Sequence, residues 1–195
     1  MNSIYELANE LHAAAVEKGF WDVEGAEEKH IAKMHSELSE ALQEDRMNRP
    51  MLYVDDIGYI ESVSTIEQFY ADFKGRKPEG IAAELADFVM MMLDLVAYKG
   101  NPIEDADYEI CFNIEHDDEY IAMCTSPLYV VVCAMHRFVA DLIDAENADE
   151  FAQIIGPCIG CIHNWLDYRG IDLWKVIRLK MEYNKARPKL HGRKY

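Results

Sequence analysis

The feature that most constrains the fold of this chain is a long apolar run over residues 78–100, PEGIAAELADFVMMMLDLVAYKG. Its apolar residues recur with the three-to-four-residue period of an α-helix that buries one face. Glu84 and Asp87 stand at the edge of this apolar stripe rather than opposite to it. The run therefore predicts a core helix that carries two carboxylates to the margin of the buried face.

A second run, residues 30–46 with the sequence HIAKMHSELSEALQEDR, carries Glu37 and Glu40 at the same spacing. Residues three apart on a helix lie on one face, so two such helices packed together would gather four carboxylates. Carboxylates in an apolar place repel one another and lose hydration unless protons or cations neutralise them. An all-oxygen cluster suits a hard divalent ion, above all Mg²⁺.

Composition limits the partners that this chain can have. The 195 residues carry a formal net charge of −17, which argues against nucleic-acid binding because a phosphate backbone needs basic surface. The amino terminus lacks the pattern of a signal peptide, and no run of about eighteen apolar residues predicts a membrane span. With an odd number of cysteines, five, reduced thiols are the default. We expect a cytoplasmic protein that binds neither nucleic acid nor membrane.

Helical periodicity predicts an all-α fold, a helical bundle in one domain over residues 1–195. Residues 48–78 are predicted to form a long loop, with a short strand or helical turn near 66–73. Residues 1–100 form the half with the acid cluster, 101–169 an insertion or degenerate repeat, and 170–195 a basic helix and tail. The helices are predicted at residues 4–18, 26–47, 78–100, 128–145, 148–168 and 172–186.

A degenerate internal duplication is also predicted. LVAYKGNPIEDA resembles WLDYRGIDLWKV, and AKMHSELSEAL resembles VCAMHRFVADL. A duplicated helix pair would let one chain form a bundle that otherwise needs two, although amphipathic helices also align with one another by chance. In this alignment the second copy keeps the helices but loses the acids: Glu37, Glu40, Glu84 and Asp87 correspond to Phe138, Asp141, Ile154 and Pro157.

The last predicted helix carries Lys180, Asn184 and Arg187 at spacings of four and seven, which places them on one face. A row of ammonium, amide and guanidinium suits a polyphosphate. The alternative is a solvated basic helix end that complements the macrodipole. Trp21 falls in a predicted turn after the first helix, where its ring either covers the core or stacks on a base.

Three segments together resemble a known family: HSELSEAL at residues 35–42, ELAD at 84–87, and GIDL, KMEYNKARP and HGRKY within 170–195. The combination resembles the MazG-like branch of the all-α nucleoside triphosphate pyrophosphohydrolases, a superfamily that includes dimeric dUTPases and dCTP pyrophosphatases. The resemblance covers residues 1–47, 78–100 and 170–195, about half of the chain. It implies hydrolysis of a nucleoside triphosphate to the monophosphate and pyrophosphate.

The resemblance also implies roles for individual residues. Glu37, Glu40, Glu84 and Asp87 would be the catalytic acids and would hold Mg²⁺, or Mn²⁺ as a substitute. Lys180, Asn184 and Arg187 would bind the phosphates, Trp21 would contact the base, and Glu40 is the candidate acceptor of a proton from the attacking water. Relatives usually complete their pockets from a second chain, so we expect a homodimer, or a monomeric pseudo-dimer if the duplication is real. The insertion at 101–169 and the long loop at 48–78 depart from the family pattern.

Two other classes of function remain open from the sequence. A carboxylate-bridged iron or manganese bundle needs Glu-x-x-His on two helices, and here Glu27 and His30 alone have that spacing. In a non-enzymatic helical interaction protein, the acids would form a solvated face, without dependence on metal or nucleotide. The sequence does not name the base or the sugar of a substrate.

Overall fold

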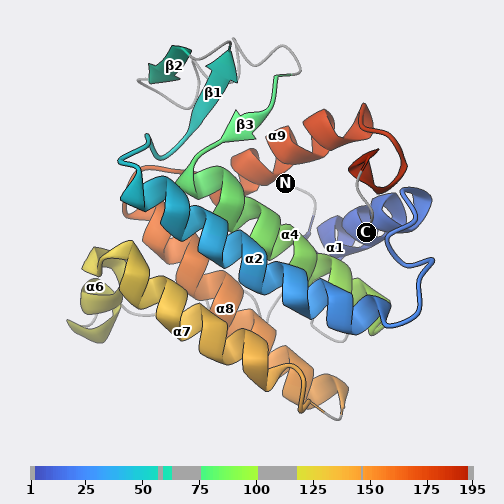
Figure 1. Cartoon of the computed structure of the whole chain (residues 1–195). Coiled ribbons are helices and arrows are strands. Elements are labelled where there is room, and N and C mark those ends of the chain that lie inside the picture. The colour runs from blue at the N-terminus through green and yellow to red at the C-terminus, as the bar shows by residue number, and fades with distance from the viewer. Residues whose placement is uncertain (1–2, 57–58, 63–75, 101–117, 146, 193–195) are drawn as a thin grey trace.

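The computed structural model describes residues 3–56, 59–62, 76–100, 118–145 and 147–192. Within these residues the chain is mostly helical, which confirms the all-α prediction (Figure 1). Each of the six predicted helices is present with its ends shifted by a few residues, and the short α6 was not predicted. The helices are α1 (Ile4–Glu17), α2 (Ala26–Arg46), α4 (Ile81–Tyr98), α6 (Asp118–Thr125), α7 (Leu128–Asp141), α8 (Ala148–Asp167), α9 (Leu173–Lys185) and the 3₁₀ turn η1 (Lys189–Gly192).

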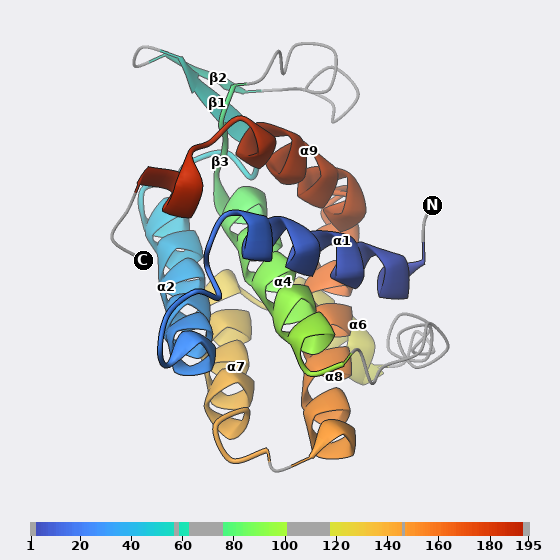
Figure 2. The same ribbon diagram turned by 90° about the vertical axis from the view of Figure 1, so that its right-hand side faces the viewer.

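Helix α4 is the central element of the fold. It contacts α1, α2, α8, α9 and β3, and thirteen of its residues are buried, from Ile81 to Val96. Figure 2 shows α2, α4, α7 and α8 running lengthwise as a bundle, while α1 and α9 cross one side of α4. A helix that is apolar around most of its circumference is buried in this way. Any polar side chain on α4 is therefore held close to the core.

The position of α4 is fixed where it begins. Gly80, its N-cap, has φ +102°, and a Cβ there would lie 2.7 Å from the Pro50 carbonyl oxygen and 2.9 Å from that of Met51. Only glycine accepts this backbone conformation together with this close approach. The Ala82 amide then donates to the Met51 carbonyl at 2.8 Å. The chain before α4 is thus locked against the helix whose first turn carries Glu84.

A small antiparallel sheet stands at one end of the bundle, in the order β2-β1-β3 (Figure 1). Its strands are β1 (Tyr53–Asp56), β2 (Tyr59–Ser62) and β3 (Pro78–Glu79). This corrects the predicted loop over 48–78, because strands of two to four residues are too short to show a clear alternation of apolar and polar side chains. The short element predicted near 66–73 lies outside the described residues.

Two observations support the predicted duplication. Helix α2 packs on α4, and α7 packs on α8, as the alignment requires. His35 and His136, which correspond in the alignment, also meet: their Nδ1 atoms lie 2.8 Å apart and their rings are stacked. Contact between equivalent residues is expected on the axis of a two-fold arrangement. The duplication itself stays a prediction, which a superposition of the two helix pairs would test.

Candidate active site

Three of the predicted acids meet where α2 packs on α4. Glu37 comes from α2, and Glu84 and Asp87 come from successive positions on one face of α4. Each offers a carboxylate oxygen, and these three atoms lie within 4.8 Å of one another. Glu84 is buried with 7% of its surface exposed, while Glu37 and Asp87 are partly exposed. The i, i+3 spacing on two packed helices is therefore enough to create the cluster.

Glu40 stands at the rim of this cluster rather than inside it. It lies one turn beyond Glu37 on α2, is exposed, and accepts a hydrogen bond of 2.8 Å from the Ser36 hydroxyl. Among the described residues, the group close enough to share one ion consists of Glu37, Glu84 and Asp87. The predicted cluster of four thus becomes a triad, the acid triad, with a fourth carboxylate beside it.

Burial changes the protonation of the acid triad. Desolvation, together with the charges of Asp87 and Glu40, raises the pKa of Glu37 to about 8. Desolvation also raises the pKa of Glu84 to about 7, against the opposing influence of the Lys180 ammonium. Both shifts have the cause expected for carboxylates removed from water and placed beside one another. Without a metal, the acid triad therefore holds protons at neutral pH.

Lys180 is the cation built into the cluster. Its residue is only 2% exposed, and its Nζ lies 2.5 Å from Asp87 Oδ2. Burial by itself lowers the pKa of Lys180, but the charges of Asp87 and Glu84 outweigh it, so that the pKa is raised above its usual value. Lys180 is consequently a buried ammonium whose charge is balanced by the acid triad.

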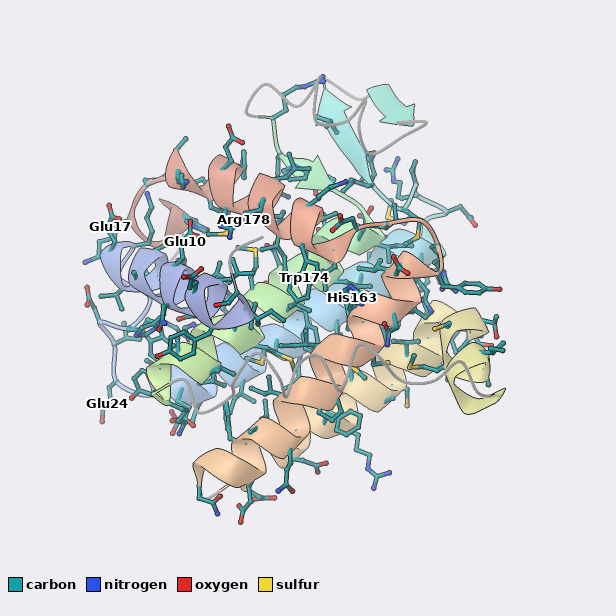
Figure 3. All side chains as sticks on the ribbon, turned by 180° about the vertical axis from the view of Figure 1, so that it is seen from behind. Glu10, Glu17, Glu24, His163, Trp174 and Arg178 are labelled. Atoms are coloured by element: carbon teal, nitrogen blue, oxygen red, sulfur yellow. The ribbon has the colours of Figure 1, made fainter. Side chains whose placement is uncertain are left out.

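The acid triad and Lys180 form part of the wall of a pocket of about 400 Å³ between α1, α2, α4 and α9. This volume lies within the range of small-molecule sites. On one side Glu10 of α1 reaches Arg178 of α9, with Oε2 and Nη1 2.6 Å apart (Figure 3). Apolar side chains line another part of the wall: Leu11, Ala14, Ala15, Met90, Met91 and Met181.

The predicted phosphate-binding residues all line this pocket. Lys180 and Asn184 lie on α9, which ends at Lys185, so Arg187 follows the helix rather than continuing its face. The predicted row of three on one helix is corrected in this respect, although the Arg187 guanidinium still donates to Asn184 Oδ1 at 3.3 Å. Basic groups and the acid triad thus share one cavity.

Further basic or imidazole side chains in this wall were not predicted for it, among them Lys18, Lys33 and His191. Lys33 precedes Glu37 by one helical turn, so the spacing rule that found the acids would also have found it. Lys18 lies at the end of α1, and His191 lies in η1 after Pro188. No local sequence pattern places these two residues beside α2.

Trp21 is not among the described residues that line the pocket. Its ring is stacked between His30, at 4.1 Å between centroids, and Tyr98, at 4.0 Å. The indole Nε1 donates to the Asp94 carboxylate at 3.0 Å. Both ring faces are therefore covered, and this arrangement gives no support to the predicted contact with a base.

The Asp94 carboxylate, which accepts from Trp21, also contacts two histidines. Its Oδ1 lies 2.7 Å from His12 Nδ1, and its Oδ2 lies 2.8 Å from His30 Nε2. Both His30 and Asp94 are buried and line the pocket. The other His30 nitrogen lies 3.0 Å from the Ala26 carbonyl oxygen. Both nitrogens of His30 thus face acceptors, which fixes the ring and leaves neither nitrogen open to a metal.

The iron or manganese alternative finds no support in this geometry. It requires Glu27 and His30 to point at one metal. Glu27 instead pairs with Lys99 at 2.6 Å, and His30 is held by Asp94 and Ala26. The acid triad, by contrast, is an all-oxygen ligand set, which fits a hard ion such as Mg²⁺, and Mn²⁺ accepts the same donors.

Among the described residues, no helix combines the length and the apolarity that crossing a membrane requires. A scan against models of known protein families, a search of curated proteins and a search of solved structures each find no match.

Proposed function

We propose that this protein hydrolyses a nucleoside triphosphate to the monophosphate and pyrophosphate in a Mg²⁺-dependent reaction. The observation that carries the proposal is the acid triad, whose carboxylate oxygens lie within 4.8 Å of one another, in the same cavity as Lys180, Asn184 and Arg187. A polyphosphate chelated to a metal needs both kinds of group: carboxylates toward the ion and cations toward the phosphate oxygens.

Glu37, Glu84 and Asp87 are the residues that would hold Mg²⁺. When bound, the ion supplies neutralisation of the triphosphate charge and lowers the pKa of a water molecule. Glu40 lies outside the triad and is exposed, so its carboxylate would not be occupied by the ion and would accept a proton from the water that attacks the α-phosphorus. No side-chain nucleophile is needed in this scheme.

The basic groups act on the substrate and on the leaving group. Arg187 and Lys33 line the pocket and would bind phosphate oxygens, while Asn184 accepts from the Arg187 guanidinium and orients it. Lys180 is paired with Asp87, so its ammonium would be shared between the acid triad and the substrate. Fixed cations stabilise the charge that gathers on departing pyrophosphate.

The apolar part of the pocket would receive the base. Leu11, Met90 and Met91 contribute to it, and methionine side chains adapt to flat rings of different outline. We therefore expect contacts of shape and dispersion rather than a set of hydrogen bonds specific for one base. The protein would act as a homodimer, or as a monomeric pseudo-dimer if the duplication is real. Light scattering at micromolar concentration would distinguish these two states.

The test is product analysis with a panel of ribo- and deoxyribonucleoside triphosphates, in Mg²⁺ and in EDTA. We expect monophosphate and pyrophosphate in equal amounts with Mg²⁺ alone. Glu84→Gln and Asp87→Asn should each lower turnover about 100-fold or more, the scale on which positioned catalytic groups act. Asp141→Asn, the position that corresponds to Glu40 in the second repeat, is the matched control. Full activity in both triad variants would refute the site, and no turnover of any substrate by folded protein would favour the non-enzymatic helical protein.

A further inference from the structure

The chain beyond α9 folds back over the end of α1 and closes the pocket. We call residues 186–192 the C-terminal strap. The Lys18 ammonium donates to the carbonyl of Lys185 at 3.1 Å and to that of Arg187 at 2.6 Å. In return, the Leu190 amide donates to the Lys18 carbonyl at 2.9 Å. The C-terminal strap is thus fastened to the end of α1 at several points.

The backbone of the C-terminal strap is held in an unfavourable conformation. Leu190 and His191 are consecutive non-glycine residues with φ of +50° and +51°. Such residues cost about 1 kcal/mol or more each and persist where the surroundings hold them. The contacts with Lys18, together with the Lys189–Asp22 ion pair at 2.9 Å, provide this restraint. Strain of this kind is common at ligand sites because it aims a side chain.

The side chain aimed by this turn is His191. It lines the pocket, and its ring meets the Phe20 ring edge to face, with centroids 5.0 Å apart. The charges that act on it come from each neighbouring element: Arg187 in the strap, Lys33 on α2, Lys18 at the end of α1 and, with opposite sign, Asp87 on α4. His191 therefore occupies a predominantly basic corner of the pocket.

Burial lowers the pKa of His191, and Arg187 and Lys33 lower it further, to about 4. At neutral pH this imidazole is uncharged. It is the neighbouring cations, together with desolvation, that prevent it from taking a proton. A polyanion that enters the corner would cancel the repulsion and offer an acceptor to the second ring nitrogen. The chemistry of the corner thus changes when phosphate arrives.

We propose that His191 is a phosphate-binding residue that takes up one proton from solvent when a polyphosphate enters the pocket and returns it when the product leaves. The inference rests on the proposed function, since it assumes that the pocket receives a triphosphate. In the free protein the neutral ring avoids adding a fourth positive charge to Lys18, Lys33 and Arg187. In the complex the imidazolium donates to a phosphate oxygen, a charge-assisted contact.

Proton uptake makes polyphosphate affinity depend on pH in a way that fixed cations do not. Between the pKa of His191 in the free protein and its higher pKa in the complex, each unit by which the pH falls strengthens binding up to tenfold. Removing the imidazole should therefore weaken binding most in mildly acidic solution. The effect should vanish in alkaline solution, where neither state holds the proton.

The experiment is calorimetric titration of the full chain with inorganic triphosphate at saturating Mg²⁺, in two buffers of different ionisation enthalpy. The difference between the buffers counts the protons taken up. Compared with wild type, His191→Gln should lose about 0.9 of a proton at pH 6.5 and bind about 10-fold more weakly, with little difference at pH 8.5. His163→Gln, a histidine on α8 that is not among the described pocket residues, should match wild type.

Equal proton uptake and equal affinity in wild type and His191→Gln would overturn the inference. If that result accompanied Mg²⁺-dependent turnover, the proposed function would stand without it. If wild type bound no triphosphate, both would fall. Should His191→Gln fail to fold, NMR of the His191 ring in wild type decides: conversion to the imidazolium on adding triphosphate supports the inference, and an unchanged neutral ring refutes it.

Discussion

Replacing Lys180 by methionine tests the electrostatic balance of the acid triad most directly. Methionine preserves much of the side-chain volume but removes the ammonium that lies 2.5 Å from Asp87. Breaking a buried ion pair from one side costs about 3–5 kcal/mol. We expect about 3 kcal/mol, the lower end of that range, because the Asp87 side chain keeps 25% of its exposure and can recover hydration.

The assay is urea unfolding in EDTA. With an m-value of about 3 kcal/mol per molar, the loss moves the midpoint down by about 1 M. Lys175→Met on the same helix is the matched control, because its ion pair with Asp172 is 49% and 40% exposed and should be worth less than about 1 kcal/mol. In an Asp87→Asn background, the effect of Lys180→Met should fall by at least about 1 kcal/mol, the coupling expected for direct contact.

Two results would refute this reasoning. One is a Lys180→Met protein as stable as the Lys175→Met control in EDTA, which would mean that the ammonium does not stabilise the negative charge of the acid triad. The other is an equal loss with and without the Asp87 carboxylate, which would assign the effect to packing. Excess Mg²⁺ should restore part of the lost stability, because the ion supplies the missing positive charge to the same oxygens.

Other perturbations test separate parts of the structure. The pKa of Glu37 is raised to about 8 and that of Glu84 to about 7, so the folded metal-free chain keeps protons that the unfolded chain releases at lower pH. The free energy of unfolding should therefore fall as the pH rises from 5 to 8, and it should fall less steeply in Glu37→Gln. An unchanged slope in urea titrations of that variant would contradict this. Trp21→Phe should cost about 1–2 kcal/mol through the lost donor to Asp94 without altering KM differently for different bases, and a base-dependent change would restore the predicted base contact. Gly80→Ala should lower stability in thermal unfolding by at least about 2 kcal/mol more than Gly100→Ala, because the second position has open space; equal losses would mean that the close approach is unimportant.

The sequence predicted the acid triad because its logic is local. Glu37 on one helix, and Glu84 with Asp87 on another, need only helical spacing and one packing contact to meet. The same local logic placed Glu40 in the cluster, whereas the structure leaves it exposed at the rim of the acid triad. The local logic also failed for Arg187, because the helix ends two residues before it. Where a helix ends is less strongly encoded than where it lies.

Other parts of the site depend on contacts between distant segments. Trp21 contacts Tyr98 and Asp94, more than seventy residues away. The sequence around Trp21 does not show whether its ring is covered by other side chains or exposed to a ligand. The position of His191 depends on the return of the chain to Lys18, and no periodicity of apolar residues in the sequence predicts this contact. The strands of the small sheet were missed because they are short. Local patterns thus gave the helices and the acids, while the closure of the pocket required the tertiary structure.

The buried Lys180 also makes folding independent of metal binding. Small domains that rely on a metal to neutralise their ligands stay unfolded until the ion arrives. Here the compensating charge is part of the chain and already rests against Asp87. Under the proposed function, a newly made molecule would complete its fold without the ion and persist in an inactive form. It would become active when the ion binds, without new synthesis or refolding.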